Sequence, residues 1–280
     1  MDTEVTPTTA VTVNEILDHY ERECLPNLAP GTIKGYRYHL RDLRKAFGSA
    51  VASELRPKDF GPYLNVRRGK CHRVRQLAVL SAAFTQAVSF WYLLPTNVLR
   101  DVKRPKAKPR DRLVSDAEFK GLAAQVPKRI RLAMMLAVLT GQRQGDIIRF
   151  RWSDIQDNAL NIQQGKTGKR LAIEITKDLE ETLDQCWLLP AGGHAGSEFV
   201  LPNMYGRAYT PEGFRACWQK EMNKWVRRGN ARHTFHDLRA LAATRCPTPE
   251  IAMRLLGHSN ISMTLRVYRR GVERVSALTV

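Results

Sequence analysis

A ten-residue segment, 103–112 (KRPKAKPRDR), does most to limit how this 280-residue chain can fold. Its two prolines are incompatible with a regular helix, and Ala107 is its one hydrophobic residue, so the segment cannot join a core. A chain of this length can bury a separate core on each side of such a break. We therefore expect a flexible start over 1–10, a first domain over 11–102, a basic interdomain linker over 103–112, and a second domain over 113–280.

The first domain is expected to be helical. Between Pro30 and Gly48, hydrophobic residues recur at spacings of three and four, which is the period of an amphipathic helix with one buried side. The same reasoning predicts a shorter helix over 57–66 and a longer one over about 72–93.

The second domain is expected to combine helices with one small sheet. A capping-box pattern at Ser115–Glu118 predicts a helix start, and a further helix is expected over 128–140, ending at Gly141. Alternating hydrophobic residues over 160–175, interrupted by Gly-Lys-Thr-Gly-Lys, predict a β-hairpin. Helices should resume at about Thr210. The predicted fold is therefore mainly α with a small β-sheet or hairpin, and the second domain is α+β.

The net charge of +18 and the pI near 10.1 favour a polyanionic partner, and a nucleic acid is the commonest one. Ribosomal, membrane-surface and heparin-binding proteins share such an excess. No hydrophobic run approaches the ~18 residues that a membrane span needs, and the polar, acidic start is unlike a secretion signal. Five scattered cysteines argue against a zinc site or a disulfide framework and fit a reducing cytoplasm.

Two groups of basic side chains are candidates for contacts to DNA phosphates. One lies at the entry and on the outer side of the long helix of the first domain, and the other lies in the linker, where an extended path beside phosphate is expected. The alternative for the linker is a solvated connection that touches nothing. The candidates are Arg67, Arg68, Lys70, Arg73 and Arg75, and Lys103, Arg104, Lys106, Lys108 and Arg110.

Several side chains of the second domain are suited to phosphate chemistry, although each also has an ordinary explanation. Arg143 and Asp146 follow a helix end at a glycine, where they could form an exposed ion pair. Lys166 stands at the predicted hairpin tip, from which an ammonium group can reach a ligand outside the sheet. Loop lysines are nevertheless common.

The C-terminal third adds two histidines, an arginine and a tyrosine. His236 and Arg239 are one helical turn apart, so both side chains could meet one phosphate. His258 follows a glycine that would end a helix, and Tyr268 is flanked by arginines ten residues later. Taken singly, such residues are more often ordinary surface groups.

Taken together and in this order, these elements resemble the tyrosine recombinase (phage integrase) family. The likeness extends from Leu113 to about Arg270, and the first domain is similar to the family's helical core-binding domain. The matching elements are Thr140-Gly-Gln-Arg143, Gly165-Lys166-Thr-Gly, His236-Asp-Leu-Arg239, Leu256-Gly-His258-Ser and Tyr268.

By this resemblance the chain is a site-specific recombinase that cuts and rejoins DNA through a 3′-phosphotyrosine, with no metal and no other cofactor. Tyr268 would be the nucleophile and Asp146 would brace the site. Its partners would be double-stranded DNA at specific crossover sites and other copies of the chain, as a dimer per site and a tetramer in synapsis, without a membrane. Accessory DNA-bending proteins could assist in the host cytoplasm. The catalytic residues implied are Arg143, Lys166, His236, Arg239, His258 and Tyr268.

Some features depart from the family's pattern. Asp146 stands where relatives more often have Glu, and Ala240 stands where many have His or Arg, so an accessory contact is expected to be missing. The small arm-binding domain of many phage integrases is expected to be absent from this chain or to have been removed from it. Two alternatives remain: relaxation of supercoils by chemistry like that of a type IB topoisomerase, and a DNA-binding relative that has lost catalysis. The target site, and whether the role is integration, excision or chromosome maintenance, stay open.

Overall fold

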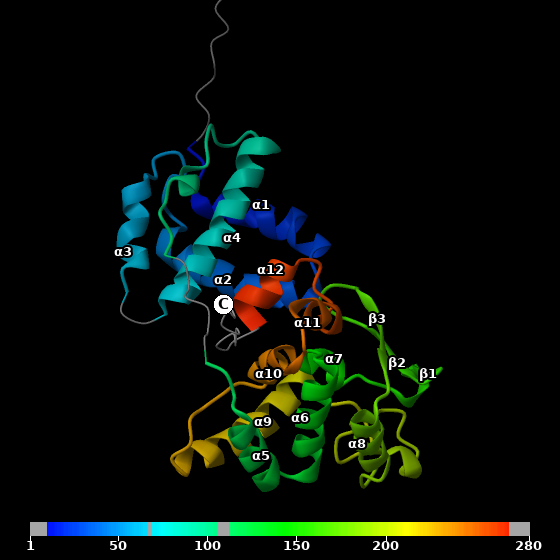
Figure 1. The fold of residues 1–280 in the computed structure, drawn as a ribbon. Helices are drawn as coiled ribbons and strands as arrows, with labels where there is room; N and C mark the ends of the chain where they lie inside the picture. The colour runs from blue at the N-terminus through cyan, green and yellow to red at the C-terminus, as the bar shows by residue number, and fades with distance from the viewer. Residues whose placement is uncertain (1–9, 67–68, 106–111, 269–280) are drawn as a thin grey trace, which may run out of the picture. The chain divides into compact units, whose positions relative to one another are not determined.

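The computed structural model describes residues 10–66, 69–105 and 112–268 (Figure 1). Its contacts divide the chain into two compact units, Met1–Lys108 and Pro109–Val280. The division falls inside the basic segment 103–112. Most of that segment, and the expected flexible start, lie outside the described residues.

The first unit is built from helices around one hydrophobic core. Helices α1, α2 and α4 pack on one another through buried side chains that include Leu17, Leu40, Leu43, Leu80 and Phe84. The helices are α1 (Val13–Glu23), α2 (Pro30–Phe47), α3 (Gly61–Leu64) and α4 (Lys70–Ser89), with 3₁₀ turns at Leu25–Asn27, Pro57–Phe60 and Val98–Arg100.

Two predicted helices of this unit differ in extent from the observed ones. The helix expected over 57–66 is a 3₁₀ turn followed by the single turn of α3. The helix expected to reach residue 93 ends at Ser89, because Tyr92 adopts a positive φ of 53° and the Leu93 N–H bonds back to the Ala87 carbonyl at 2.8 Å. Glycine usually occupies such a position, and its absence hid this helix end in the sequence.

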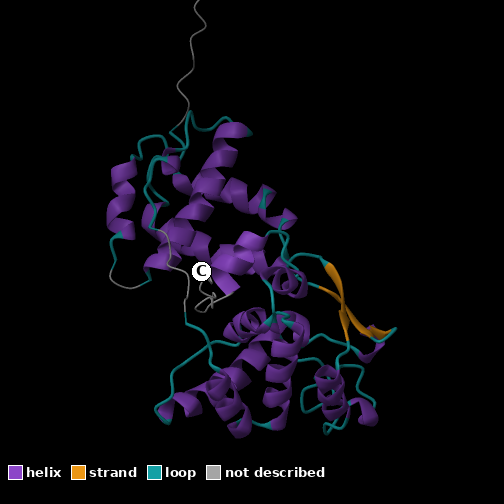
Figure 2. Ribbon diagram, viewed as in Figure 1, coloured by secondary structure: helices purple, strands orange, loops and turns teal. Residues whose placement is uncertain are grey.

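The second unit is mostly helical, with a three-stranded antiparallel sheet at one edge (Figure 2). The strands run in the order β1 (Ile155–Gln156), β2 (Ala159–Gln163) and β3 (Arg170–Glu174), with Leu160 opposite Ile173. The helices are α5 (Asp116–Gln125), α6 (Lys128–Thr140), α7 (Gln144–Ile147), α8 (Lys177–Trp187), α9 (Pro211–Arg227), α10 (Asp237–Arg245), α11 (Pro249–Leu256) and α12 (Ile261–Met263), and a π-helical turn, Thr264–Tyr268, follows.

The fold class predicted from the sequence is confirmed. Ser115 caps α5 in a capping box, α6 has the predicted bounds, and the alternating residues form the hairpin of β2 and β3. The short strand β1 was not predicted. Helix α6 is buried nearly all round, with α8 and α10 packed on it, so its C-terminal end is held rigidly where the candidate site begins. No helix among the described residues is long and apolar enough to cross a membrane.

Candidate active site

Arg143 lies where the chain leaves α6. Gly141, with φ of 66°, ends that helix in a left-handed conformation that other residues rarely adopt, and Arg143 then caps α7. Its Nη1 donates a hydrogen bond to Oε1 of Gln164 at 3.0 Å. The turn after α6 and the buried Gln164 therefore fix the position of this half-buried guanidinium group.

Lys166 lies on the loop between β2 and β3, with its side chain exposed. The loop is closed at its base by a hydrogen bond from the Gln164 N–H to the Lys169 carbonyl at 2.9 Å. Asp146, which is buried, accepts from the Gly165 N–H at 2.9 Å and pairs with Arg149 at 3.0 Å. Asp146 thereby ties the lysine loop to α7.

Arg239 lies deepest in the site, only 1% exposed, on the first turn of α10. Nη1 donates to the Gly141 carbonyl at 2.5 Å, while Nη2 donates to the Leu256 carbonyl at 2.6 Å and contacts Nε2 of His258 at 3.1 Å. Burial, and then the charge of Arg143, lower the pKa of Arg239 to about 10, so it stays cationic at neutral pH. Among the described residues nothing accepts a hydrogen bond from its Nε.

His258 is held as a neutral ring. A guanidinium group can only donate, so Nε2 of His258 must accept from Arg239, and the ring proton resides on Nδ1, 2.8 Å from Oγ1 of Thr264. Burial, and then the charges of Arg239 and Arg143, lower the pKa of His258 to about 4. The imidazole therefore orients Arg239 without adding a positive charge.

This low pKa predicts how stability depends on pH. An unfolded histidine takes up a proton near its ordinary pKa of ~6.5, whereas folded His258 resists it until about pH 4, so protons favour unfolding between these values. We expect acidification from pH 7 to 4 to lower the free energy of unfolding less in His258→Gln than in the wild type, by up to about 3 kcal/mol. Urea unfolding of the full chain at each pH measures this difference. Parallel pH profiles for the two proteins would contradict this assignment.

Tyr268 lies at the end of the π-helical turn, 8% exposed, with its ring among three of the predicted catalytic side chains. Its hydroxyl oxygen is 3.1 Å from Nε2 of His236. The ring centroid is 4.7 Å from that of His258 and 5.4 Å from the Arg239 guanidinium carbon. His236, which is exposed at the start of α10, is thus the histidine within reach of the hydroxyl, while His258 lies against the ring.

The structure therefore brings five of the six predicted catalytic residues into one cluster and gives the two histidines different neighbours. Arg143 belongs to the cluster because Gln164, which accepts from it, also donates to the Leu256 carbonyl that Arg239 contacts. Lys166 is attached to the cluster through its loop: the neighbouring Thr167 hydroxyl donates to Oε1 of Gln164 at 2.8 Å.

Sequence reasoning missed the residues that hold these groups in place. Gln142 and Gln164 form a buried amide pair, joined at 2.7 Å, and Thr264 fixes the His258 ring. A signal for Gln164 existed. Strand alternation puts it on the inward side with Leu160 and Ile162, where a polar side chain needs a buried partner.

The basic residues proposed for DNA contact in the first unit are not equivalent. Lys70, Arg75 and Lys103 are exposed, whereas Arg73 lies 4.5 Å over the Tyr63 ring and Arg104 donates to the Leu99 carbonyl at 2.9 Å. Arg67, Arg68, Lys106, Lys108 and Arg110 lie outside the described residues.

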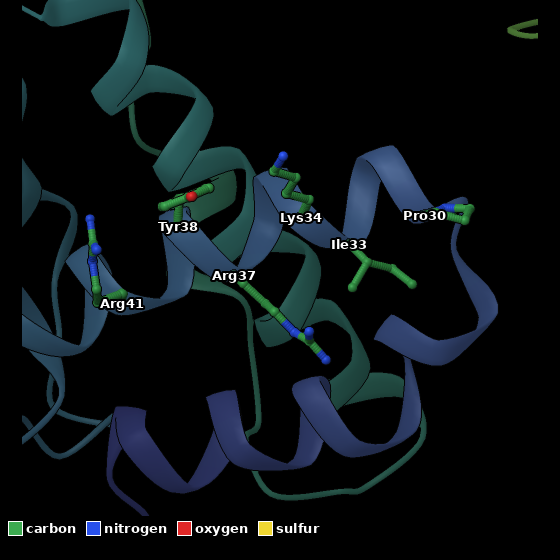
Figure 3. A pocket seen from close by; sticks show the side chains of 6 residues that line it. All are labelled: Pro30, Ile33, Lys34, Arg37, Tyr38 and Arg41. Atoms are coloured by element: carbon green, nitrogen blue, oxygen red, sulfur yellow. The ribbon is translucent and has the colours of Figure 1, made fainter. Parts of the chain in front are cut away.

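A further basic surface, which sequence reasoning missed, lies along α2 (Figure 3). A groove of about 590 Å³ is lined by Lys34, Arg37, Tyr38 and Arg41, together with two apolar residues. Arg41 lies over the Tyr38 ring at 5.4 Å, and that tyrosine is 51% exposed. The α2 pattern predicted its buried side correctly, but the charges on its outer side were not considered.

The known proteins that are similar in sequence include several phage integrases. The sequence profile of the phage integrase family matches residues 113–273. The integrase of Escherichia phage HK022 is 30% identical over 275 residues, covering 92% of this chain and 75% of that protein. The integrase of Escherichia phage lambda is 28% identical over 270 residues, covering 91% of this chain and 75% of that protein.

Solved structures with a similar fold also include integrases. The fold is similar to a lambda integrase (75–356) dimer bound to a COC′ core site, with a TM-score of 0.82, 26% identity, and coverage of 95% of this chain and 99% of that chain. It is also similar to a lambda integrase tetramer bound to a Holliday junction, with a TM-score of 0.82, 27% identity, and coverage of 96% and 81%.

Proposed function

The chain belongs to the phage integrase family and is a tyrosine-type site-specific DNA recombinase, and we propose that Tyr268 is its nucleophile, activated within the cluster of arginines and histidines around it. The observation that carries the assignment is the Tyr268 hydroxyl 3.1 Å from His236, with its ring beside the buried Arg239. Such a hydroxyl is placed for attack on a phosphate that the arginines would hold.

The arginines would offset the negative charge of the phosphodiester, which is the main barrier to attack. A phosphodiester repels a nucleophile, and its transition state gathers more negative charge on the non-bridging oxygens, so fixed cationic donors are required. Arg143 and Arg239 each present planar sets of N–H donors, which match phosphate oxygens better than a lysine does. Nε of Arg239 is buried and has no acceptor among the described residues, so this donor is not used within the protein.

The proposed step is a transesterification. The Tyr268 oxygen forms a bond to phosphorus, the bond from phosphorus to the 5′-oxygen breaks, His236 takes the tyrosine proton and Lys166 protonates the 5′-oxygen. The products are a 3′-phosphotyrosine and a 5′-hydroxyl. One phosphodiester replaces another, so the reaction needs no ATP, and the 5′-hydroxyl of a second strand completes the exchange. The arginines provide the charge that a metal ion would otherwise supply.

The partners follow from the family. The chain binds double-stranded DNA and assembles with copies of itself, as lambda integrase does in its core-site dimer and Holliday-junction tetramer. The exposed Lys70, Arg75 and Lys103, and the α2 surface, are suited to phosphate contacts. We assign the reaction to the host cytoplasm, with accessory DNA-bending proteins as potential helpers.

A plasmid assay separates this function from the topoisomerase alternative. The DNA flanking the gene is cloned as candidate attachment sites on one supercoiled plasmid, and a plasmid without sites is the control. We expect recombinant products from the first plasmid and little relaxation of the second. Relaxation of both plasmids at equal rates, with no recombinants, would favour a type IB topoisomerase. Site binding without any strand cleavage would favour an inactive relative.

A further inference from the structure

We propose that Gln164 is a positioning residue for strand cleavage, because its side-chain amide holds Arg143 and the Lys166 loop against the carbonyl that also anchors Arg239. This inference rests on the proposed function, since it gives Gln164 a role only through those groups. Gln164 itself is fully buried at the base of the loop and does not reach the surface where DNA would lie.

The amide of Gln164 uses its whole hydrogen-bonding capacity. Nε2 donates to Oε1 of Gln142 at 2.7 Å and to the Leu256 carbonyl at 2.9 Å. Oε1 accepts from Nη1 of Arg143 at 3.0 Å and from the Thr167 hydroxyl at 2.8 Å. Two donor and two acceptor sites are all that an amide offers, so one side chain joins its own loop to the segment after α6 and to the end of α11.

Chemistry fixes the orientation of this amide. A carbonyl such as that of Leu256 can only accept and a guanidinium such as that of Arg143 can only donate, so the nitrogen must face the first and the oxygen the second. The fit is also close sterically. A Cβ added at Gly257 would lie 2.8 Å from Nε2 of Gln164, so this glycine lets α11 end directly against the amide.

The neutrality of Gln164 is essential to the proposed role. A carboxylate at this position would also hold Arg143, but it would offset the charge that the phosphate needs and would turn an acceptor toward the Leu256 carbonyl. An apolar side chain would leave the long arginine free to sample other rotamers. An amide fixes the guanidinium group while leaving its full charge available.

The test measures single-turnover cleavage of a nicked attachment site by the full chain. We expect Gln164→Met, which keeps the shape and removes all four hydrogen bonds, to cleave on the order of 10²-fold more slowly, the cost of a catalytic group displaced by about 1 Å. Site affinity should stay close to that of the wild type. The matched control is Gln156→Met, at an exposed position of strand β1, which should cleave at the wild-type rate.

A double-mutant cycle shows whether Gln164 acts through Arg143. In the Arg143→Ala background, Gln164→Met should slow cleavage by no more than about tenfold, because Arg143 is already gone and only the hold on the Lys166 loop is left to lose. A second full loss of about 10²-fold in that background, or wild-type cleavage by Gln164→Met alone, would overturn the proposal.

If circular dichroism shows that Gln164→Met does not fold, the cycle is run with Gln164→Glu. This variant keeps both acceptor contacts in the wild-type background, where we expect it also to be slow, and its additional loss in the Arg143→Ala background should be far smaller than about 10²-fold. Failure of this inference is distinguishable from failure of the proposed function, because the latter would leave the wild type itself without a Tyr268 adduct.

Discussion

Tyr268→Phe is expected to form no covalent adduct with DNA while binding its site as the wild type does. The substitution removes one hydroxyl group and keeps the ring, which packs against His258 at 4.7 Å and His236 at 5.5 Å between centroids. The surrounding cluster should therefore keep its geometry, and the lost function is the nucleophile alone. The assay is a nicked suicide substrate, whose short 5′ fragment diffuses away after cleavage and traps the wild-type adduct.

The matched control is Tyr205→Phe, because Tyr205 belongs to the same unit and is 77% exposed. It should yield as much adduct as the wild type. A covalent band that persists in Tyr268→Phe would mean that another residue is the nucleophile.

Lys166→Ala is expected to slow cleavage by roughly 10²–10⁴-fold, the range typical of general acid catalysis. Lost activity alone would not define the role, since a lysine could also stabilise the phosphate or hold the loop against DNA. Replacing the bridging 5′-oxygen by sulfur separates these roles, because a thiolate leaves readily without a proton. On that substrate Lys166→Ala should approach the wild-type rate.

Two further variants make the sulfur experiment decisive. Arg143→Ala, which loses charge stabilisation, should stay slow on both substrates. Lys169→Ala removes the other lysine of the same loop, whose charge reaches His258, and it should show no selective gain from sulfur. If sulfur fails to rescue Lys166→Ala, the proton comes from another group, and rescue of Lys169→Ala instead would identify that lysine as the acid.

Local patterns made much of the fold predictable from the sequence. The capping box at Ser115, the end of α6 at Gly141 and the alternation through Leu160 and Ile162 each involve residues close in the chain. The extents of α3 and α4 were predicted less well. A positive φ at Tyr92, rather than at a glycine, leaves no compositional signal.

The order and types of the candidate catalytic residues could be predicted from the sequence. The hydrogen bonds that connect them could not. Gln164 donates hydrogen bonds to residues 22 and 92 positions away in the chain, and no local sequence pattern indicates such long-range contacts. The neutrality of His258 likewise depends on burial and on the charge of Arg239. The sequence therefore implied both histidines as catalytic residues, and only three-dimensional packing distinguishes the one that touches the Tyr268 hydroxyl.

The central claim is that this chain joins itself to DNA through Tyr268 with a 3′-phosphate linkage. Its most direct test is to trap the wild-type protein on the nicked site, digest protein and DNA, and identify the modified peptide by mass spectrometry. We predict a nucleotide attached to the peptide that contains Tyr268, with a free 5′-hydroxyl on the released strand. A nucleotide on any other residue, or a 5′-phosphate linkage to the protein with a new 3′-hydroxyl at the cleavage position, would contradict this expectation.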